Sequence, residues 1–210
     1  MALFFRRNIP LIMARTVWSP VILWSAGVKL RIQGKELMEP QNSHPVIVVS
    51  NHSSFLDIPI ICRCVPVNLH FTAKTQIKKL PLFGLYMMAT GMIFIDRSNK
   101  QKAIQSIDTA AVLIRNGKNV LIYPEGKRST NGQIARFKKG AFHLAIKSGA
   151  DIVPVAISGA ARAWPKSGKK LKPGIVNVYL GKRIPSTDYK AESVNEFAQT
   201  TRRIIEGMMP

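Results

Sequence analysis

The chain has 210 residues, of which 46% are hydrophobic, and this is enough to form the core of one domain. Its 31 Lys and Arg residues against 11 Asp and Glu residues give a net charge of +20, which indicates a polyanionic partner, either nucleic acid or an anionic membrane surface. The two cysteines, Cys62 and Cys64, are poorly placed for a disulfide, which excludes a disulfide framework, and with four histidines they suggest no structural zinc site.

Residues 1–29 combine basic and apolar side chains. Every charged residue before Glu36 is Lys or Arg, and these cations are interleaved with Leu, Ile, Phe and Trp, as in an interfacial membrane anchor. A stretch of about twenty mostly apolar residues approaches the length of a membrane span, but Pro10, Arg15 and Pro20 interrupt it. We therefore expect a helix or helix pair that lies in a membrane surface. The alternative is a hydrophobic helix packed on the domain.

Residues 30–210 show the pattern of a single α/β domain. Short apolar runs rich in β-branched residues alternate with amphipathic helical patterns, which predicts a central, mostly parallel β-sheet flanked by helices. Helices are expected over 102–115 and 140–148, each followed closely by a glycine, and a last amphipathic helix over 194–205. The expected strands are Val46–Val49, Leu69–Thr72, Met92–Ile95, Val120–Tyr123, Ile152–Ile157 and Ile175–Leu180.

A histidine and a carboxylate follow the first of these expected strands. His52 and Asp57 are five positions apart, and on a regular helix such residues lie about 140° apart. The pair therefore meets only if the backbone turns between strand and helix. In that turn Asp57 would hydrogen-bond one imidazole nitrogen and leave the other free to take a proton. The alternative is a strand end followed by a helix whose Asp57 caps backbone N–H groups.

Three further segments carry polar residues beside apolar strands. Residues 91–97 form an apolar strand with Arg97 at its end, and residues 123–129 place a carboxylate, a glycine and two cations in one turn after a strand. In residues 153–159 a hydrophobic strand contains Pro154, which fits an edge or bulged position. Each of these segments is commonplace when taken alone.

Together, and in this order, the four segments closely resemble the glycerophospholipid acyltransferase family. Its blocks read roughly as Asn-His-x4-Asp, Gly-x-Ile-x-x-Asp-Arg, Phe-Pro-Glu-Gly-Thr-Arg-Ser and Val-Pro-Val, and the resemblance covers about residues 30–185. The size of the chain resembles that of the short 1-acylglycerol-3-phosphate (lysophosphatidic acid) acyltransferases. The resemblance implies a membrane-associated enzyme at a cytoplasmic face, here expected to be that of a bacterial inner membrane.

The resemblance also implies a reaction. His52 would be the general base that takes the proton of the acceptor hydroxyl, and Asp57 would fix its tautomer and stabilise the imidazolium. The hydroxyl would attack the thioester carbonyl of acyl-CoA or an acylated acyl carrier protein, giving phosphatidic acid. No metal or cofactor beyond this co-substrate is implied. A covalent acyl-serine on Ser53 or Ser54 is an alternative, although the resemblance favours direct transfer.

Phosphate recognition needs fixed cations, and the resemblance names three of them. Arg128 and Arg97 are the first candidates because guanidinium groups match phosphate oxygens, and Lys74 is the third. The alternative for Arg97 is a surface pair with Asp96. The other two residues of the turn complete the binding-site prediction: Glu125 would contact the glycerol hydroxyl or hold these cations, and Gly126 would let the backbone approach the substrate.

The chain departs from the family pattern in two places of the turn. Tyr123 replaces the usual Phe, and Lys127 stands where Thr is common, which leaves the acceptor open. One alternative is therefore another lysolipid such as lyso-ornithine lipid, which lacks the phosphomonoester. A second alternative is a non-catalytic membrane lipid-binding module, although it gives no reason for the His–Asp pair. No recognition helix or aromatic sheet motif is present, so nucleic acid is not expected as a partner.

Overall fold

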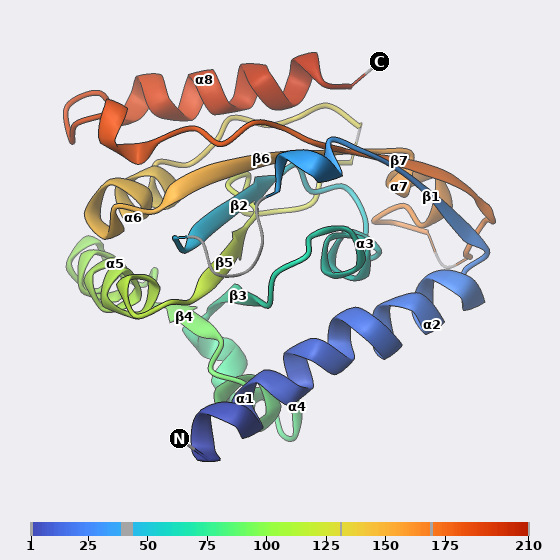
Figure 1. Ribbon diagram of the computed structural model, residues 1–210, viewed down its shortest axis with the longest axis horizontal. Coiled ribbons are helices and arrows are strands. Elements are labelled where there is room, and N and C mark those ends of the chain that lie inside the picture. Colours follow the sequence, from blue (N-terminus) through green and yellow to red (C-terminus); the bar gives the residue numbers. More distant parts are fainter. Residues whose placement is uncertain (1, 39–43, 131, 169, 210) are drawn as a thin grey trace.

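The computed structural model describes residues 2–38, 44–130, 132–168 and 170–209, and its centre is a β-sheet. In the described part of the chain this sheet has seven strands in the order β1-β7-β6-β2-β5-β3-β4. All neighbouring strands are parallel except β6 and β7, which are antiparallel. The strands are β1 (Val28–Gln33), β2 (Val46–Ser50), β3 (Leu69–Lys74), β4 (Ile93–Ile95), β5 (Asn119–Ile122), β6 (Asp151–Ser158) and β7 (Gly174–Leu180) (Figure 1).

Helices cover both faces of the sheet (Figure 1). One hydrophobic core joins the sheet to α5, α6 and α8, and a second core on the other face joins it to α2, α3 and α7. Short 3-10 turns cover 35–37, 75–79 and 186–188. The helices after the N-terminal segment are α3 (Asp57–Cys64), α4 (Phe83–Ala89), α5 (Lys100–Arg115), α6 (Gly140–Ser148), α7 (Ala160–Ala163) and α8 (Val194–Gly207).

Strand β2 shows why the sheet lies between two helical layers. Its five residues are all buried, and their side chains alternate between the two cores. Val46 and Val48 belong to the core with α3, whereas Ile47 and Val49 belong to the core with α5 and α6. A strand that is buried on both faces has a continuous apolar sequence, as parallel strands do. The expected α/β fold with a mostly parallel sheet is confirmed, and so are the six expected strands and the three expected helices.

Strand β1 was not expected from the sequence. Its residues alternate between buried or half-buried apolar side chains and exposed polar ones, because β1 is the edge strand beside β7. Lys29 and Arg31 lie on the exposed side, so the basic pattern of this segment is that of a solvated edge strand.

Of the two positions expected for Pro154, the edge is wrong, because β6 lies between β7 and β2 in the sheet, and the bulge is observed. Val155 pairs with Leu180, and Ile152 pairs with Ile184 across a separate bridge, so three residues of the opposite segment stand against two residues of β6. No ladder partner requires an N–H from Pro154 there, and its carbonyl accepts the N–H of Gly181 at 2.8 Å.

The N-terminal segment is helical from Ala2 to Ser25. It consists of α1 (Ala2–Met13), a π-helical turn η1 (Ala14–Trp18) and α2 (Ser19–Ser25). The wide turn ends two residues before Pro20, which lacks an N–H and whose ring would crowd the carbonyl of Thr16 in a regular helix. No helix in the described part of the chain is long and apolar enough to cross a membrane.

One side of this segment packs on the domain and the other side is exposed. Leu23 is buried in the core that contains α3, and the Arg15 guanidinium donates to the carbonyl of Pro66. The packed helix, which was the alternative, is therefore observed, while the location in a membrane surface and the division at residue 29 stay predictions. The exposed side carries Ile9, Ile12, Met13, Val17, Trp18, Val21 and Trp24.

Candidate active site

The candidate residues follow the carboxyl ends of four parallel strands. His52 follows β2, Lys74 is the last residue of β3, Arg97 follows β4 and Glu125 follows β5. These strands are neighbours in the sheet and run in the same direction, so their carboxyl ends lie along one edge. In open α/β sheets this edge is the usual place for a ligand site. The topology therefore explains how residues far apart in the sequence reach one region.

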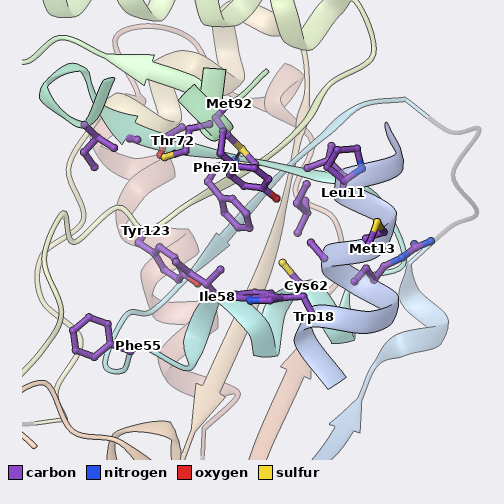
Figure 2. A pocket seen from close by; sticks show the side chains of 18 of the residues that line it. Leu11, Met13, Trp18, Phe55, Ile58, Cys62, Phe71, Thr72, Met92 and Tyr123 are labelled. Carbon is purple, nitrogen blue, oxygen red and sulfur yellow. Dashed lines mark hydrogen bonds between the residues drawn. The ribbon is translucent and has the colours of Figure 1, made fainter. Parts of the chain in front are cut away.

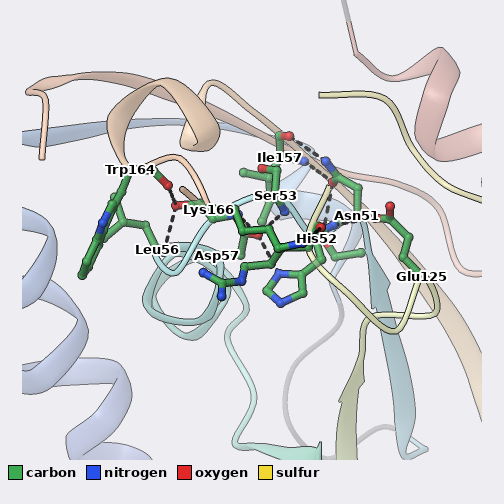
Figure 3. Close-up of polar contacts among 12 residues, drawn as sticks. Asn51, His52, Ser53, Leu56, Asp57, Glu125, Ile157, Trp164 and Lys166 are labelled. Carbon is green, nitrogen blue, oxygen red and sulfur yellow. Dashed lines mark hydrogen bonds and ion pairs between the residues drawn. The ribbon is translucent and has the colours of Figure 1, made fainter. Parts of the chain in front are cut away.

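His52 and Asp57 form a hydrogen-bonded pair, as the sequence predicted. His52 Nδ1 lies 2.8 Å from Asp57 Oδ2, with the turn between β2 and α3 bringing the two together (Figure 3). Because a carboxylate only accepts, Nδ1 carries the hydrogen and Nε2 keeps its lone pair. The Asp57 side chain is fully buried, whereas that of His52 is 18% exposed. The free ring nitrogen thus belongs to the more accessible member of the pair.

Asp57 also holds the turn that brings it to His52. Its Oδ2 accepts the backbone N–H groups of Ser53 at 2.7 Å and Ser54 at 2.8 Å. Both amides lie before α3, so Asp57 stabilises the turn that precedes its helix and is not a cap of the helix N–H groups. The sequence left a His–Asp pair and a helix cap as alternatives. The structure has the pair, and the same carboxylate oxygen also binds two backbone amides of the turn.

Glu125 holds the main chain of His52. The His52 N–H donates to Glu125 Oε1 at 2.7 Å, and the Ala135 N–H donates to Oε2 at 2.9 Å (Figure 3). Glu125 is only 3% exposed, and burial raises the pKa of its carboxyl, although the two amide hydrogen bonds oppose this shift. Among the described residues no ion pair joins Glu125 to the expected cations, and its contact with the glycerol hydroxyl stays a prediction. The observed contacts of Glu125 hold the backbone of His52 and of Ala135.

The aromatic ring of Tyr123 packs on the imidazole. The ring centroids of His52 and Tyr123 are 4.0 Å apart and the planes are inclined by 15°, so the rings are stacked. Burial, followed by the nearby Asp57 carboxylate, raises the pKa of the Tyr123 phenol well above its usual value. The ring is therefore a neutral wall that restricts the imidazole to one plane. A Phe, which the family pattern has here, would provide the same surface.

Two residues next to the pair fix its strand and turn to the rest of the fold. The Asn51 amide donates to the Ile157 carbonyl at 2.9 Å and accepts the Ile157 N–H at 2.8 Å, which ties the end of β2 to β6 (Figure 3). Ser54 is fully buried, and its hydroxyl donates to the carbonyl of Trp164 at 2.7 Å. Since this hydroxyl is directed at Trp164 and not at His52, the geometry gives no support to an acyl-serine on Ser54.

The predicted cations occupy two different positions. Lys74 and Arg97 are exposed and line the same cavity as His52. Arg128 is half-buried with its guanidinium 3.5 Å from the ring centroid of Phe55, and it does not line that cavity. Asp96 accepts the N–H of Ser98 at 2.9 Å, and among the described residues no ion pair joins it to Arg97. Arg97 is therefore available to a ligand.

Gly126 lies at the wall of this cavity with a backbone conformation that favours glycine. Its φ is +74°, and a Cβ at this position would come within 2.8 Å of the Lys138 Nζ. Lys127, the unusual residue of the turn, is exposed and does not line the cavity. The glycine thus permits the turn, and the extra charge of Lys127 faces solvent.

The cavity beside the His–Asp pair is large and mainly apolar. Its volume is about 1270 Å³, and Figure 2 shows side chains from the N-terminal helix, α3 and β3 around it. Leu11 and Trp18 come from the N-terminal segment, Cys62 from α3 and Phe71 from β3. The N-terminal segment was not expected at the site, because the pairing of two distant apolar surfaces leaves no local pattern in the sequence. The cavity has the size and lining that suit long hydrocarbon chains.

The acyltransferase family model matches residues 29–158. The chain belongs to the acyltransferase family. The matched range contains all of the predicted site residues, which are His52, Asp57, Lys74, Arg97, Glu125, Gly126 and Arg128.

Individual acyltransferases are similar over most of this chain. A 1-acyl-sn-glycerol-3-phosphate acyltransferase of Cocos nucifera is 31% identical over 192 residues, which cover 90% of this chain and 61% of that protein. The human 1-acyl-sn-glycerol-3-phosphate acyltransferase beta is 33% identical over 177 residues, 84% of this chain and 64% of that protein. The chain thus spans less than two thirds of the length of these two curated relatives.

The fold is also similar to that of a solved acyltransferase. The crystal structure of the 1-acyl-sn-glycerophosphate (LPA) acyltransferase PlsC from Thermotoga maritima aligns with a TM-score of 0.80 at 24% identity. The alignment covers 98% of this chain and 86% of that one. The two chains therefore share the same fold over nearly the whole of this chain.

Proposed function

We propose that this acyltransferase moves a fatty acyl group from an acyl thioester, acyl-CoA or acylated acyl carrier protein, to the free hydroxyl of 1-acylglycerol-3-phosphate. The product is phosphatidic acid. The observation that carries the proposal is the His52–Asp57 pair at an apolar cavity that also contains Lys74 and Arg97. A base, two cations and a long apolar space match the hydroxyl, the phosphate and the acyl chains of these substrates.

The proton transfer follows from the tautomer of His52. Its Nε2 lone pair accepts the proton of the acceptor hydroxyl while the oxygen forms a bond to the thioester carbonyl carbon. The tetrahedral intermediate then collapses, the C–S bond breaks, and the leaving thiolate takes the proton from the imidazolium. The Asp57 carboxylate stabilises this imidazolium in both steps, because it is fully buried and directly bonded to Nδ1.

Phosphate binding orients the acceptor in this proposal. Lys74 ends β3 and Arg97 follows β4, and these two strands pair directly in the sheet. Both side chains line the cavity that His52 faces, so a phosphate held between them would direct the glycerol hydroxyl towards the base. Arg128 lies outside this lining, and its buried terminal nitrogen has no hydrogen-bond partner among the described residues. Stacking on Phe55 occupies the face of the guanidinium and leaves its N–H groups available, so Arg128 stays a proposed phosphate ligand at the edge of the site.

The N-terminal segment gives this site access to a membrane in the proposal. Its exposed side carries large apolar side chains, while Leu11, Met13 and Trp18 also line the cavity. A helix of this kind lies in the interface of an anionic bilayer, which we infer to be the cytoplasmic face of a bacterial inner membrane. The lysophospholipid acceptor is then delivered by the same surface that holds the enzyme.

The test is an acceptor and donor panel with the purified full chain. Lysophosphatidic acid, lyso-ornithine lipid and lysophosphatidylcholine are each offered with acyl-CoA and with acylated acyl carrier protein. The proposal expects the fastest transfer to lysophosphatidic acid. A clear preference for an acceptor without a phosphomonoester would replace the proposed acceptor, and vesicle binding without any transfer would support a lipid-binding module instead.

A further inference from the structure

A second exposed apolar surface lies on and before helix α4. Five large side chains of this segment are open to solvent, and Leu82 is the most exposed of them at 84%. Leu82 also has a φ of +58°, a backbone conformation that residues other than glycine, Asn and Asp rarely adopt. A strained backbone here presents an apolar side chain to solvent. The surface, called the α4 ridge below, consists of Leu80, Leu82, Leu85, Tyr86 and Met88.

The α4 ridge lies next to the N-terminal helix. Met87 of α4 and Met92 pack with Leu11 of α1 in a small buried cluster of their own. Figure 1 shows α4 beside α1, on the side of the molecule away from α8. Two segments about seventy residues apart in sequence therefore present their exposed apolar side chains at the same end of the fold.

The α4 ridge also borders the substrate cavity. Tyr86 lines the cavity and is at the same time 48% exposed, so it reaches from the cavity wall to the surface. Met13 of α1 also lines the cavity and is 54% exposed, so the cavity wall reaches the surface on both helices. A partner that covers this part of the surface, called the cavity opening below, would meet the cavity directly.

The charge around the α4 ridge indicates what this partner is. Between Asp57 and Asp96 the sequence contains no Asp or Glu, while Lys78 and Lys79 stand just before the ridge. Both lysines are exposed. Exposed leucines flanked by lysines are complementary to the acyl chains and headgroups of an anionic bilayer.

We propose that the α4 ridge is a second membrane-inserting element, which acts together with the N-terminal helix to place the cavity opening against an anionic bilayer. The choice of a lipid surface rests on the proposed function, but the ridge is independent of the chemistry at His52. Insertion on both sides of the opening would let a lysolipid pass from the bilayer into the cavity without crossing water.

The first experiment compares two double variants of the full chain. The ridge variant carries Leu82→Asp and Leu85→Asp. The control variant carries Ile104→Asp and Val112→Asp at two exposed apolar residues of α5, so both variants add the same negative charge. Binding to vesicles of phosphatidylcholine with phosphatidylglycerol is measured by co-sedimentation. The ridge variant should bind at least about tenfold more weakly, because two leucines lose their apolar contact, and the α5 variant should bind as the wild type does. Equal binding by both variants would overturn the proposal.

A fluorescent probe tests insertion directly without relying on loss of binding. Cys62 and Cys64 are buried, so a new cysteine at Leu82→Cys can be labelled selectively with an environment-sensitive dye, with Ile104→Cys as the control. The dye at position 82 should shift to the blue on addition of anionic vesicles, and the dye at position 104 should not. A shift at 82 on self-association in the absence of lipid would instead assign the ridge to contact between two copies of the chain.

Activity separates this proposal from the proposed function. Transfer to a water-soluble, short-chain lysophosphatidic acid needs no bilayer, so the ridge variant should retain it while losing transfer to acceptors embedded in vesicles. If neither the wild type nor the variant transfers acyl groups but the vesicle binding differs as expected, the acyl-transfer proposal fails and the ridge stands. Loss of the soluble activity in a folded ridge variant would mean that the ridge shapes the site and does not serve the membrane.

Discussion

The backbone N–H of His52 donates to Glu125 Oε1 at 2.7 Å, so the proposed base is held by a carboxylate that follows a different strand. Glu125 has both oxygens bonded to backbone amides and is almost completely buried. This hydrogen bond links the segment 51–57, which contains the His–Asp pair, to the turn 123–129, which contains Glu125. We therefore expect Glu125 to act as a positioning residue, in addition to the contact with substrate or cations that the family pattern implies.

Replacement of Glu125 therefore affects turnover more than acceptor binding. In Glu125→Gln one amide N–H faces an NH₂ group, and the lost hydrogen bond should destabilise the fold by about 1–3 kcal/mol. Displacement of His52 by about 1 Å should lower kcat by about 100-fold. Steady-state kinetics with varied acceptor concentration measure kcat and the acceptor KM. A large rise in the acceptor KM with unchanged kcat would assign Glu125 to the substrate.

Asp57→Asn tests the stabilisation of the imidazolium. Asn keeps an oxygen that can accept the Ser53 and Ser54 amides, but it carries no charge to stabilise the protonated ring. Loss of this charge and of the correct tautomer should lower kcat about 1000-fold or more, by analogy with other His–Asp pairs. Vesicle co-sedimentation of the same variant should be unchanged. Near-normal kcat in Asp57→Asn would show that the pair is only structural.

Arg97→Ala tests the phosphate site. Removal of a charge-assisted hydrogen bond worth about 1.5–3 kcal/mol should raise the KM for lysophosphatidic acid at least about tenfold. The KM for acyl-CoA should stay nearly constant. Lys127→Ala is the matched control, since Lys127 is an exposed cation that does not line the cavity. Equal effects of both variants would indicate a general loss of surface charge.

His70 makes the stability of the fold depend on pH. Burial, followed by the charge of Lys118, lowers the pKa of His70 from 6.5 to about 4, so the unfolded chain binds a proton more readily than the folded one between these values. The free energy of unfolding therefore does not depend on His70 above pH 6.5. As the pH falls from 6.5 towards 4, His70 lowers the free energy of unfolding by at most about 3 kcal/mol. Denaturant unfolding of the wild type and His70→Gln at pH 7 and pH 4.5 measures it. The variant should show the smaller pH dependence, and equal dependence would contradict the assignment.

The sequence predicted the parts of the site that depend on chain order and strand direction. His52, Lys74, Arg97 and Glu125 each follow a strand, and parallel strands bring their carboxyl ends together whatever the details of packing. The turn between β2 and α3 was predicted for the same reason, because His52 and Asp57 meet only if the backbone bends there. Motif order and strand periodicity were sufficient for these features.

Features that depend on side-chain direction and on contacts between distant surfaces were not predicted. The buried position of Glu125 and the stacking of Arg128 on Phe55 depend on how one turn folds back on its neighbours. The cavity wall formed by the N-terminal helix depends on packing between α1 and α4 through Leu11 and Met87, and neither residue belongs to a motif. The contacts of Asn51 could have been predicted, because a polar amide directly after a buried strand needs backbone hydrogen-bond partners.

The most direct test of the account is the rate of phosphatidic acid formation by His52→Ala compared with the wild type. Both proteins are assayed with lysophosphatidic acid and acyl-CoA on anionic vesicles, after co-sedimentation has shown equal binding. The account predicts that the wild type forms phosphatidic acid and that His52→Ala loses at least about 1000-fold in kcat, because no other base is bonded to Asp57 in the described structure. Transfer by His52→Ala at a rate near that of the wild type would contradict it.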